Sequence, residues 1–87
     1  MEKSNQDINS LEILADKYIS ESNYYDAKLI VNKLLIQNPN NYLYLSRLAY
    51  IELLLNNLEE AQSLFLKSIS ISPTYVDAYN CLGYIFK

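Results

Sequence analysis

The 87-residue sequence contains no histidine, which removes the commonest general base and the commonest metal ligand. It contains one cysteine, Cys81, which has no partner in the chain for a disulfide bond and suits a reducing compartment. Without a histidine to activate it, this thiol is a poor candidate for a catalytic nucleophile. We therefore expect no enzymatic activity, no bound metal and no cofactor.

Turn-forming residues are also scarce, with one glycine and two prolines in the whole chain. An all-β domain needs frequent turns, so this scarcity favours helices. Basic residues are few as well, because seven Lys and Arg stand against ten Asp and Glu for a net charge of −3. The nine tyrosines could stack on bases, but without a basic groove they cannot hold a phosphate backbone. We expect no nucleic-acid partner.

Long apolar runs are absent too. No stretch approaches the roughly 18 apolar residues that cross a bilayer, and residues 1–7 are polar, unlike a secretory signal. We expect no membrane insertion and a cytoplasmic protein, although a signal peptide removed earlier would leave the same sequence. Hydrophobic residues make up 51% of the chain, which is enough for the packed core of one small domain.

What the sequence does contain is an internal repeat. Two successive windows of equal length, residues 8–41 and 42–75, share seven identities at small, apolar, polar and proline positions. The matched pairs are Leu11 and Leu45, Leu14 and Leu48, Ala15 and Ala49, Asn23 and Asn57, Ala27 and Ala61, Lys33 and Lys67, and Pro39 and Pro73. A fixed period of about 20–50 residues is typical of stacked-repeat architectures.

Each period has the apolar spacing of two amphipathic helices joined by a turn. Asp7 is the predicted N-cap of the first helix, so residues 1–7 are expected to form a flexible segment. Ser22-Asn23 interrupts the apolar stripe, and asparagine tolerates the left-handed conformation that a tight helix end needs. The second helix of each pair is expected to stop before a proline, at Asn38-Pro39 and at Ser72-Pro73.

Small residues recur where paired helices would approach closely. These positions are Ala15, Ala27, Ala49, Ala61 and Gly83. Enlarging Ala27 or Ala61 is expected to cost about 1–3 kcal/mol through overpacking.

The repeated leucines, alanines and prolines resemble the tetratricopeptide repeat. This repeat is a 34-residue helix–turn–helix unit with the pattern W-x2-L-G-x2-Y…A-x3-F…P. The resemblance implies an all-α solenoid of antiparallel helix pairs, a right-handed superhelix of about five helices. Residues 8–41 and 42–75 would form two repeats, and residues 76–87 the first helix of a third, incomplete repeat. One departure is Glu52, which stands where the other copies have Tyr18 and Phe86; it would either reach solvent or pair with a lysine.

The resemblance also implies a concave groove, lined by the first helix of each pair, that holds a peptide or a partner helix. Function would then be non-catalytic protein binding, as a scaffold or adaptor. The groove-facing positions would be Asn9, Glu12, Ile13, Asp16, Leu43, Ser46, Arg47, Tyr50, Asp77, Asn80, Cys81 and Tyr84.

The charge of the groove positions limits the class of peptide that we expect to bind. Family members that clamp the acidic C-terminus of heat-shock proteins use Lys, Asn and Arg along this groove. The matching positions here are Glu12, Asp16, Arg47, Asp77 and Cys81, of which three are acidic. A neutral or basic segment is therefore the expected partner, rather than an acidic C-terminus.

Two alternatives stay open at this stage. The chain could be a self-assembly module, for example a homodimer formed through an uncovered face of the last helix. That face would contain Tyr79, Leu82, Ile85 and Phe86. The chain could equally be a fragment of a longer repeat protein that regulates attached machinery.

Overall fold

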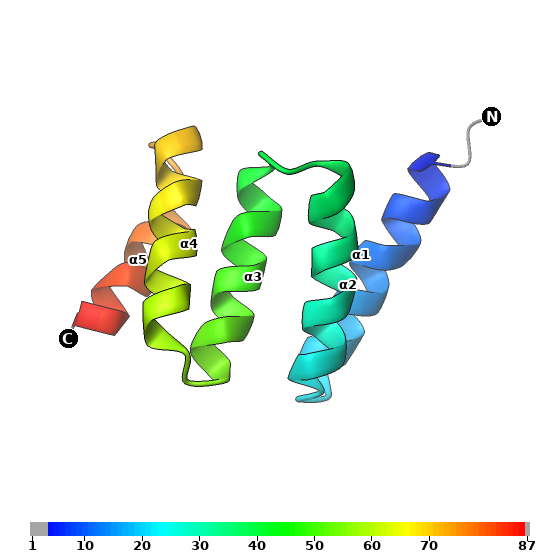
Figure 1. The fold of residues 1–87 in the computed structure, drawn as a ribbon, viewed down its shortest axis with the longest axis horizontal. Helices are drawn as coiled ribbons and strands as arrows, with labels where there is room; N and C mark the ends of the chain where they lie inside the picture. The colour runs from blue at the N-terminus through cyan, green and yellow to red at the C-terminus, as the bar shows by residue number, and fades with distance from the viewer. Residues whose placement is uncertain (1–3, 87) are drawn as a thin grey trace.

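The computed structural model describes the backbone of residues 4–86 and the side chains of residues 8–83, and all its regular structure is helical. The helices follow one another along the long axis of the molecule (Figure 1). They are α1 (Ser4–Ser20), α2 (Tyr24–Gln37), α3 (Tyr42–Leu54), α4 (Leu58–Ile71) and α5 (Val76–Phe86). Each packs chiefly against its neighbours in the chain. The prediction of an all-α fold with five helices is confirmed.

The helix boundaries repeat with the period of the sequence. Equivalent helix ends lie at equivalent positions of successive repeats. This holds for the ends of α1 and α3, for both bounds of α2 and α4, and for the starts of α3 and α5. The two prolines share one local setting, since each follows a helix end by two residues. After Pro39 the Asn41 N–H donates to the Asn38 carbonyl at 3.2 Å, and after Pro73 the Tyr75 N–H donates to the Ser72 carbonyl at 3.1 Å. The repeat is therefore a repeat of local structure as well as of sequence.

The first turn of each pair closes in the same way. Asn23 N–H donates to the Tyr18 carbonyl at 2.7 Å, and Asn57 N–H donates to the Glu52 carbonyl at 2.8 Å. The residue before each donor is left-handed, with φ of 62° at Ser22 and 66° at Asn56. The left-handed residue of the first turn is thus Ser22 and not Asn23, because this turn geometry needs positive φ one position earlier.

Replacing Ser22 by glycine is expected to raise the free energy of unfolding by up to about 1 kcal/mol, because glycine adopts positive φ without steric cost. Asn56→Gly is the matched control at the equivalent position, and its gain is expected to be smaller because asparagine already tolerates this conformation. Chemical denaturation followed by circular dichroism measures both. A gain at Asn56 equal to or larger than that at Ser22 would contradict this account.

The first helix begins earlier than predicted. Helix α1 starts at Ser4, so Asp7 lies within the helix and is not its N-cap, and residues 4–7 of the predicted N-terminal segment are helical. No proline or glycine occurs among residues 4–7 to stop the helix from extending. Helix α3, the first helix of the second pair, does begin with an N-cap. The Asn41 side chain accepts hydrogen bonds from the Leu43 and Tyr44 N–H groups at 2.9 and 3.1 Å.

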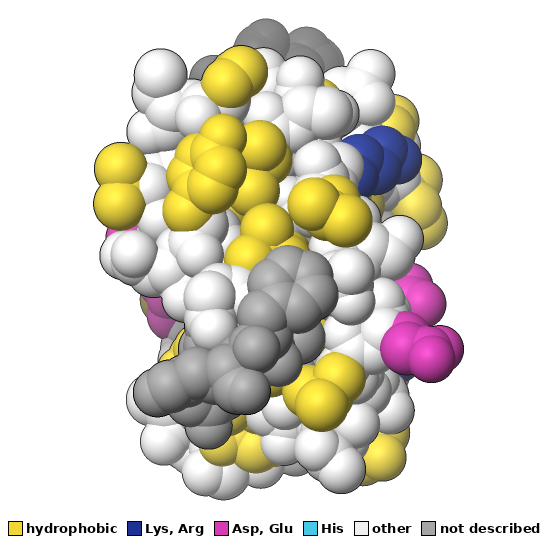
Figure 2. Space-filling model, turned by 90° about the vertical axis from the view of Figure 1, so that its left-hand side faces the viewer, with side chains coloured by type: hydrophobic (Ala, Val, Ile, Leu, Met, Phe, Trp, Pro, Cys, Tyr) yellow, Lys and Arg dark blue, Asp and Glu magenta, His cyan; other side chains and the backbone are white. Residues whose placement is uncertain are grey.

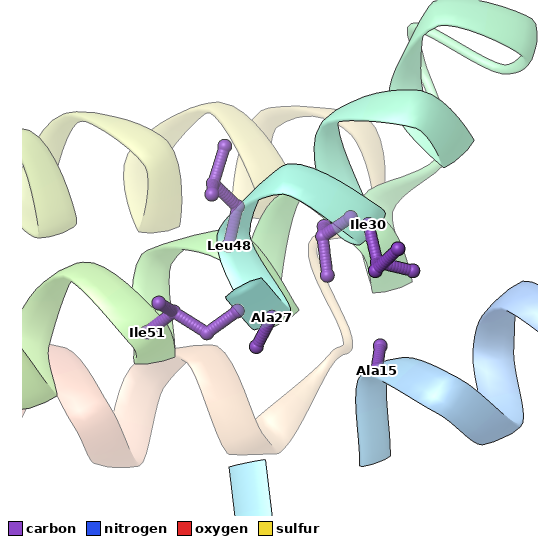
Figure 3. Packing of buried hydrophobic residues seen from close by; sticks show 6 residues of the cluster. Ala15, Ala27, Ile30, Leu48 and Ile51 are labelled. Carbon is purple, nitrogen blue, oxygen red and sulfur yellow. The ribbon is translucent and has the colours of Figure 1, made fainter. Parts of the chain in front are cut away.

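The core consists of two clusters that share α3. The first joins α1, α2 and α3 (Figure 3), and the second joins α3, α4 and α5. The first contains Ala15, Ala27, Ile30, Val31, Leu48 and Ile51, and the second contains Ala49, Ala61, Phe65, Ala78 and Leu82. The four alanines predicted at close helix contacts are all buried. The prediction for Gly83 is wrong, because Gly83 is exposed and a Cβ added there would meet nothing within 4 Å.

Across the residues that the structure describes, no helix combines the length and apolarity needed to cross a membrane.

Candidate functional site

A pocket of about 490 Å³ opens along the first helices of the two pairs and along α5. Its walls come from α1, α3 and α5, and buried residues of α2 and α4 lie directly beneath it. We call this pocket the groove. Its lining residues are Glu12, Ala15, Asp16, Val31, Leu34, Leu43, Tyr44, Ser46, Arg47, Tyr50, Phe65, Tyr75, Asp77, Asn80 and Cys81.

The structure brings together nine of the twelve groove positions predicted from the sequence. They are Glu12, Asp16, Leu43, Ser46, Arg47, Tyr50, Asp77, Asn80 and Cys81. Two others are exposed on α1 outside this lining: Ile13 lies about 100° around the helix from Glu12, and Asn9 lies nearly one turn closer to the helix start. The side chain of Tyr84, the twelfth position, lies outside the described residues.

Two tyrosines of the groove were not predicted. Tyr44 lies next to Leu43 at the start of α3, and Tyr75 lies in the loop before α5. Tyr75 occupies the repeat position of the N-cap Asn41 and packs edge-on against Tyr42, with ring centroids 5.1 Å apart. Tyrosine is not an N-cap residue, unlike asparagine at the equivalent position. A tyrosine at this repeat position was therefore the sequence signal that Tyr75 has another role.

Two polar contacts tie α1 to α3 across the groove wall. The Tyr44 hydroxyl donates to the Glu12 carboxylate at 2.6 Å, and Arg47 forms a hydrogen-bonded ion pair with Asp16. Both acidic groups of α1 that line the groove are therefore engaged by α3. The pair is solvent-exposed, so Asp16 offsets part of the charge that Arg47 presents to a ligand carboxylate.

The groove is electronegative. Glu12, Asp16 and Asp77 contribute three carboxylates against the single guanidinium of Arg47. Beside Asp77, partial burial and then the charge of this carboxylate raise the pKa of the Cys81 thiol. A raised thiol pKa favours the neutral, less nucleophilic form of Cys81.

Tyr44 is expected to make the fold less stable at high pH. Burial, and then its hydrogen bond to Glu12 and the charge of Glu12, raise the pKa of Tyr44 from 10.0 to about 12. The folded state holds the proton more tightly than the unfolded chain, so this contribution is complete below pH 10 and disappears as the pH rises from 10 to about 12. Unfolding measured across this range should show a smaller loss for Tyr44→Phe than for the unaltered chain. Equal losses in both proteins would contradict the Tyr44–Glu12 contact.

Glu52, the departure from the repeat pattern, is buried and paired. Its side chain is 4% exposed, and one carboxylate oxygen lies 2.9 Å from the Lys28 ammonium. The Asn57 side-chain amide donates to the other oxygen at 2.7 Å. Of the two possibilities raised by the sequence, pairing with a lysine is the one observed. Glu52 is not among the groove-lining residues and serves the helix packing instead.

The predicted self-association face is only partly present. Figure 2 shows hydrophobic side chains scattered over the end of the molecule that carries α4 and α5, and Tyr79 is 47% exposed. Leu82, by contrast, is buried against Ala78 and the second core cluster, so its assignment to an open face is wrong. The reason is helix geometry: Leu82 lies four residues after the buried Ala78 and so shares its face toward α4. The side chains of Ile85 and Phe86 lie outside the described residues.

Within residues 8–83, no group of three or more His, Cys, Asp or Glu side chains is arranged to hold a metal ion. A search against models of protein families finds no match to this chain, and no curated protein matches it.

Proposed function

We propose that this chain is a protein-binding module that holds a peptide or a helix of a partner protein in the groove. The observation that carries the proposal is that nine polar and apolar positions, spaced by the sequence repeat, line one pocket, with Leu43 and Tyr50 as its exposed apolar members. Pockets that bind ligands combine apolar surface with a few placed polar groups, and aromatic side chains such as Tyr50 dominate binding energy. The helix pairs would act as a tetratricopeptide-like solenoid in the cytoplasm.

The charge of the groove selects a neutral or basic segment. Three carboxylates on its walls repel an acidic C-terminus, and the one arginine is already paired with Asp16. Asp77 is the carboxylate best placed to meet a ligand cation, since Glu12 and Asp16 already have partners on α3. An amphipathic segment with lysine or arginine beside apolar residues fits these features best.

Selection from a random peptide library displayed on phage tests this proposal. Peptides retained by the immobilised chain are expected to be enriched in lysine, arginine and apolar residues. Affinities of the retained peptides, measured by fluorescence anisotropy, should fall at least about tenfold for Tyr50→Ala and by a smaller factor for Asp77→Lys. Tyr25→Ala, an exposed tyrosine on α2 outside the groove, is the matched control and should leave the peptide affinity unchanged. Enrichment of acidic peptides, or binding that survives Tyr50→Ala, would contradict the proposal.

A further inference from the structure

Helix α2 carries an apolar stripe on its outer side, away from the groove. Tyr25, Leu29 and Ile36 are 72%, 62% and 79% exposed, and their spacing places them within about 40° of one another around the helix. We call these three residues the α2 stripe. Together the three residues expose on the order of 400 Å², divided between Leu29 and Ile36 by the partly exposed Asn32.

The second repeat shows that the fold does not need this stripe. At the equivalent positions of α4 the residues are Glu59, Ser63 and Ser70, all exposed. At the fourth position of the same helix face the polarity is reversed: α2 has the polar Asn32, and α4 has the apolar Leu66. Two helices with the same role in their repeats thus differ in their outer surfaces, so the α2 stripe is a feature added to one repeat.

Charged residues on one flank of the stripe make it complementary to itself. Asp26 and Lys33 are both exposed and lie seven residues apart, two helical turns along the same side of α2. When two copies of this helix pack antiparallel about a twofold axis, the same flanks face each other. Asp26 then faces Lys33 of the partner subunit twice, while Tyr25 meets Ile36 of the partner subunit.

We infer that the α2 stripe is a homodimer interface in which two copies of this chain pack α2 antiparallel about a twofold axis. This inference is independent of the groove, because none of the stripe residues lines it. The stripe is about half of the roughly 800 Å² that each partner buries in a standard interface, so the dimer is weak. A dissociation constant on the order of 100 µM is expected.

Sedimentation equilibrium of the full chain between about 10 µM and 1 mM tests the interface. The unaltered chain should pass from monomer to dimer over this range. The variant Tyr25→Glu/Leu29→Ser/Ile36→Ser carries the residues that α4 already accommodates, so it should fold, and its dimerisation should weaken at least about tenfold. Tyr79→Ser, at the far end of the molecule, should dimerise normally. A chain that stays monomeric up to the highest concentration, or a dimer that survives the triple substitution, would overturn the inference.

A charge exchange tests the antiparallel arrangement separately. Lys33→Glu should weaken the dimer by a factor of about three to ten, because two opposite-charge pairs become like-charge pairs. Adding Asp26→Lys in the same chain should restore most of the affinity. Lys67→Glu, the equivalent change on α4, should leave it unaltered. If Lys33→Glu has no effect, or if the double variant is not restored, the antiparallel pairing is wrong.

Discussion

Phe65→Ala is expected to lower the free energy of unfolding by about 3–5 kcal/mol, the largest effect of any single truncation in the described chain. Phe65 is fully buried in α4 and belongs to the second core cluster. Three of the four other buried residues in that cluster are alanines, on α3, α4 and α5, and such short side chains cannot fill the cavity that the ring would leave. Total stabilities of about 0.05–0.15 kcal/mol per residue mean that such a loss would remove much of the stability of this chain.

Urea denaturation followed by circular dichroism measures this effect, and two variants serve as controls. Val31→Ala changes the equivalent position of the first repeat, which is also fully buried, and should cost about 1.5–3 kcal/mol because less volume is removed. Leu66→Ala changes the exposed neighbour of Phe65 and should stay within about 0.5 kcal/mol. Hydrogen exchange should show α5 losing protection first, since its attachment depends on this cluster. A smaller loss at Phe65 than at Val31 would contradict the prediction.

The features that sequence reasoning predicted correctly are those with local causes. Proline ends a helix wherever it occurs, so the ends of α2 and α4 before Pro39 and Pro73 followed from single residues. The alanines were predictable because they recur at the same repeat positions, and a repeat that stacks must keep its closest contacts small. Nine of the groove positions followed from the resemblance to the tetratricopeptide repeat, which implies a groove along the first helices of successive pairs.

The features that were missed depend on how helices pack or on fine backbone geometry. Leu82 lies on an apolar stripe of α5, but only the position of α4 shows which side of that stripe is covered. The buried residues beneath the groove are Val31, Leu34 and Phe65 of the second helices, which sequence spacing assigns to the core alone. The choice of Ser22 over Asn23 as the left-handed residue is a shift of one position, which residue preference cannot settle.

Arg47 shows why residue type alone misleads at a binding surface. Its position in the groove was predicted, and an arginine in a groove is a common anchor for ligands. The structure places Asp16, 31 residues earlier, against it, so the guanidinium joins α1 to α3. The pairing depends on the relative placement of two helices that do not follow each other in the chain, and no sequence pattern within one repeat contains this information.

Lys28→Met is expected to lower the free energy of unfolding by about 2–3 kcal/mol, because it leaves the Glu52 carboxylate buried without its cation. Breaking a fully buried ion pair costs about 3–5 kcal/mol. The smaller value applies here since the Lys28 side chain is 34% exposed, so water can reach the carboxylate once the ammonium is gone. The remaining hydrogen bond from Asn57 offsets part of the loss.

The reciprocal change should cost less, and this asymmetry separates a stranded charge from a lost contact. Glu52→Met removes the buried group, and Lys28 can turn its ammonium to solvent. The double variant Lys28→Met/Glu52→Met should return to within about 1 kcal/mol of the unaltered chain, because apolar residues of similar volume replace buried ion pairs without loss. Chemical denaturation of all four proteins closes the double-mutant cycle. A double variant as unstable as Lys28→Met alone would show that Lys28 stabilises the fold through its packing, and that the Glu52 carboxylate does not need the lysine cation.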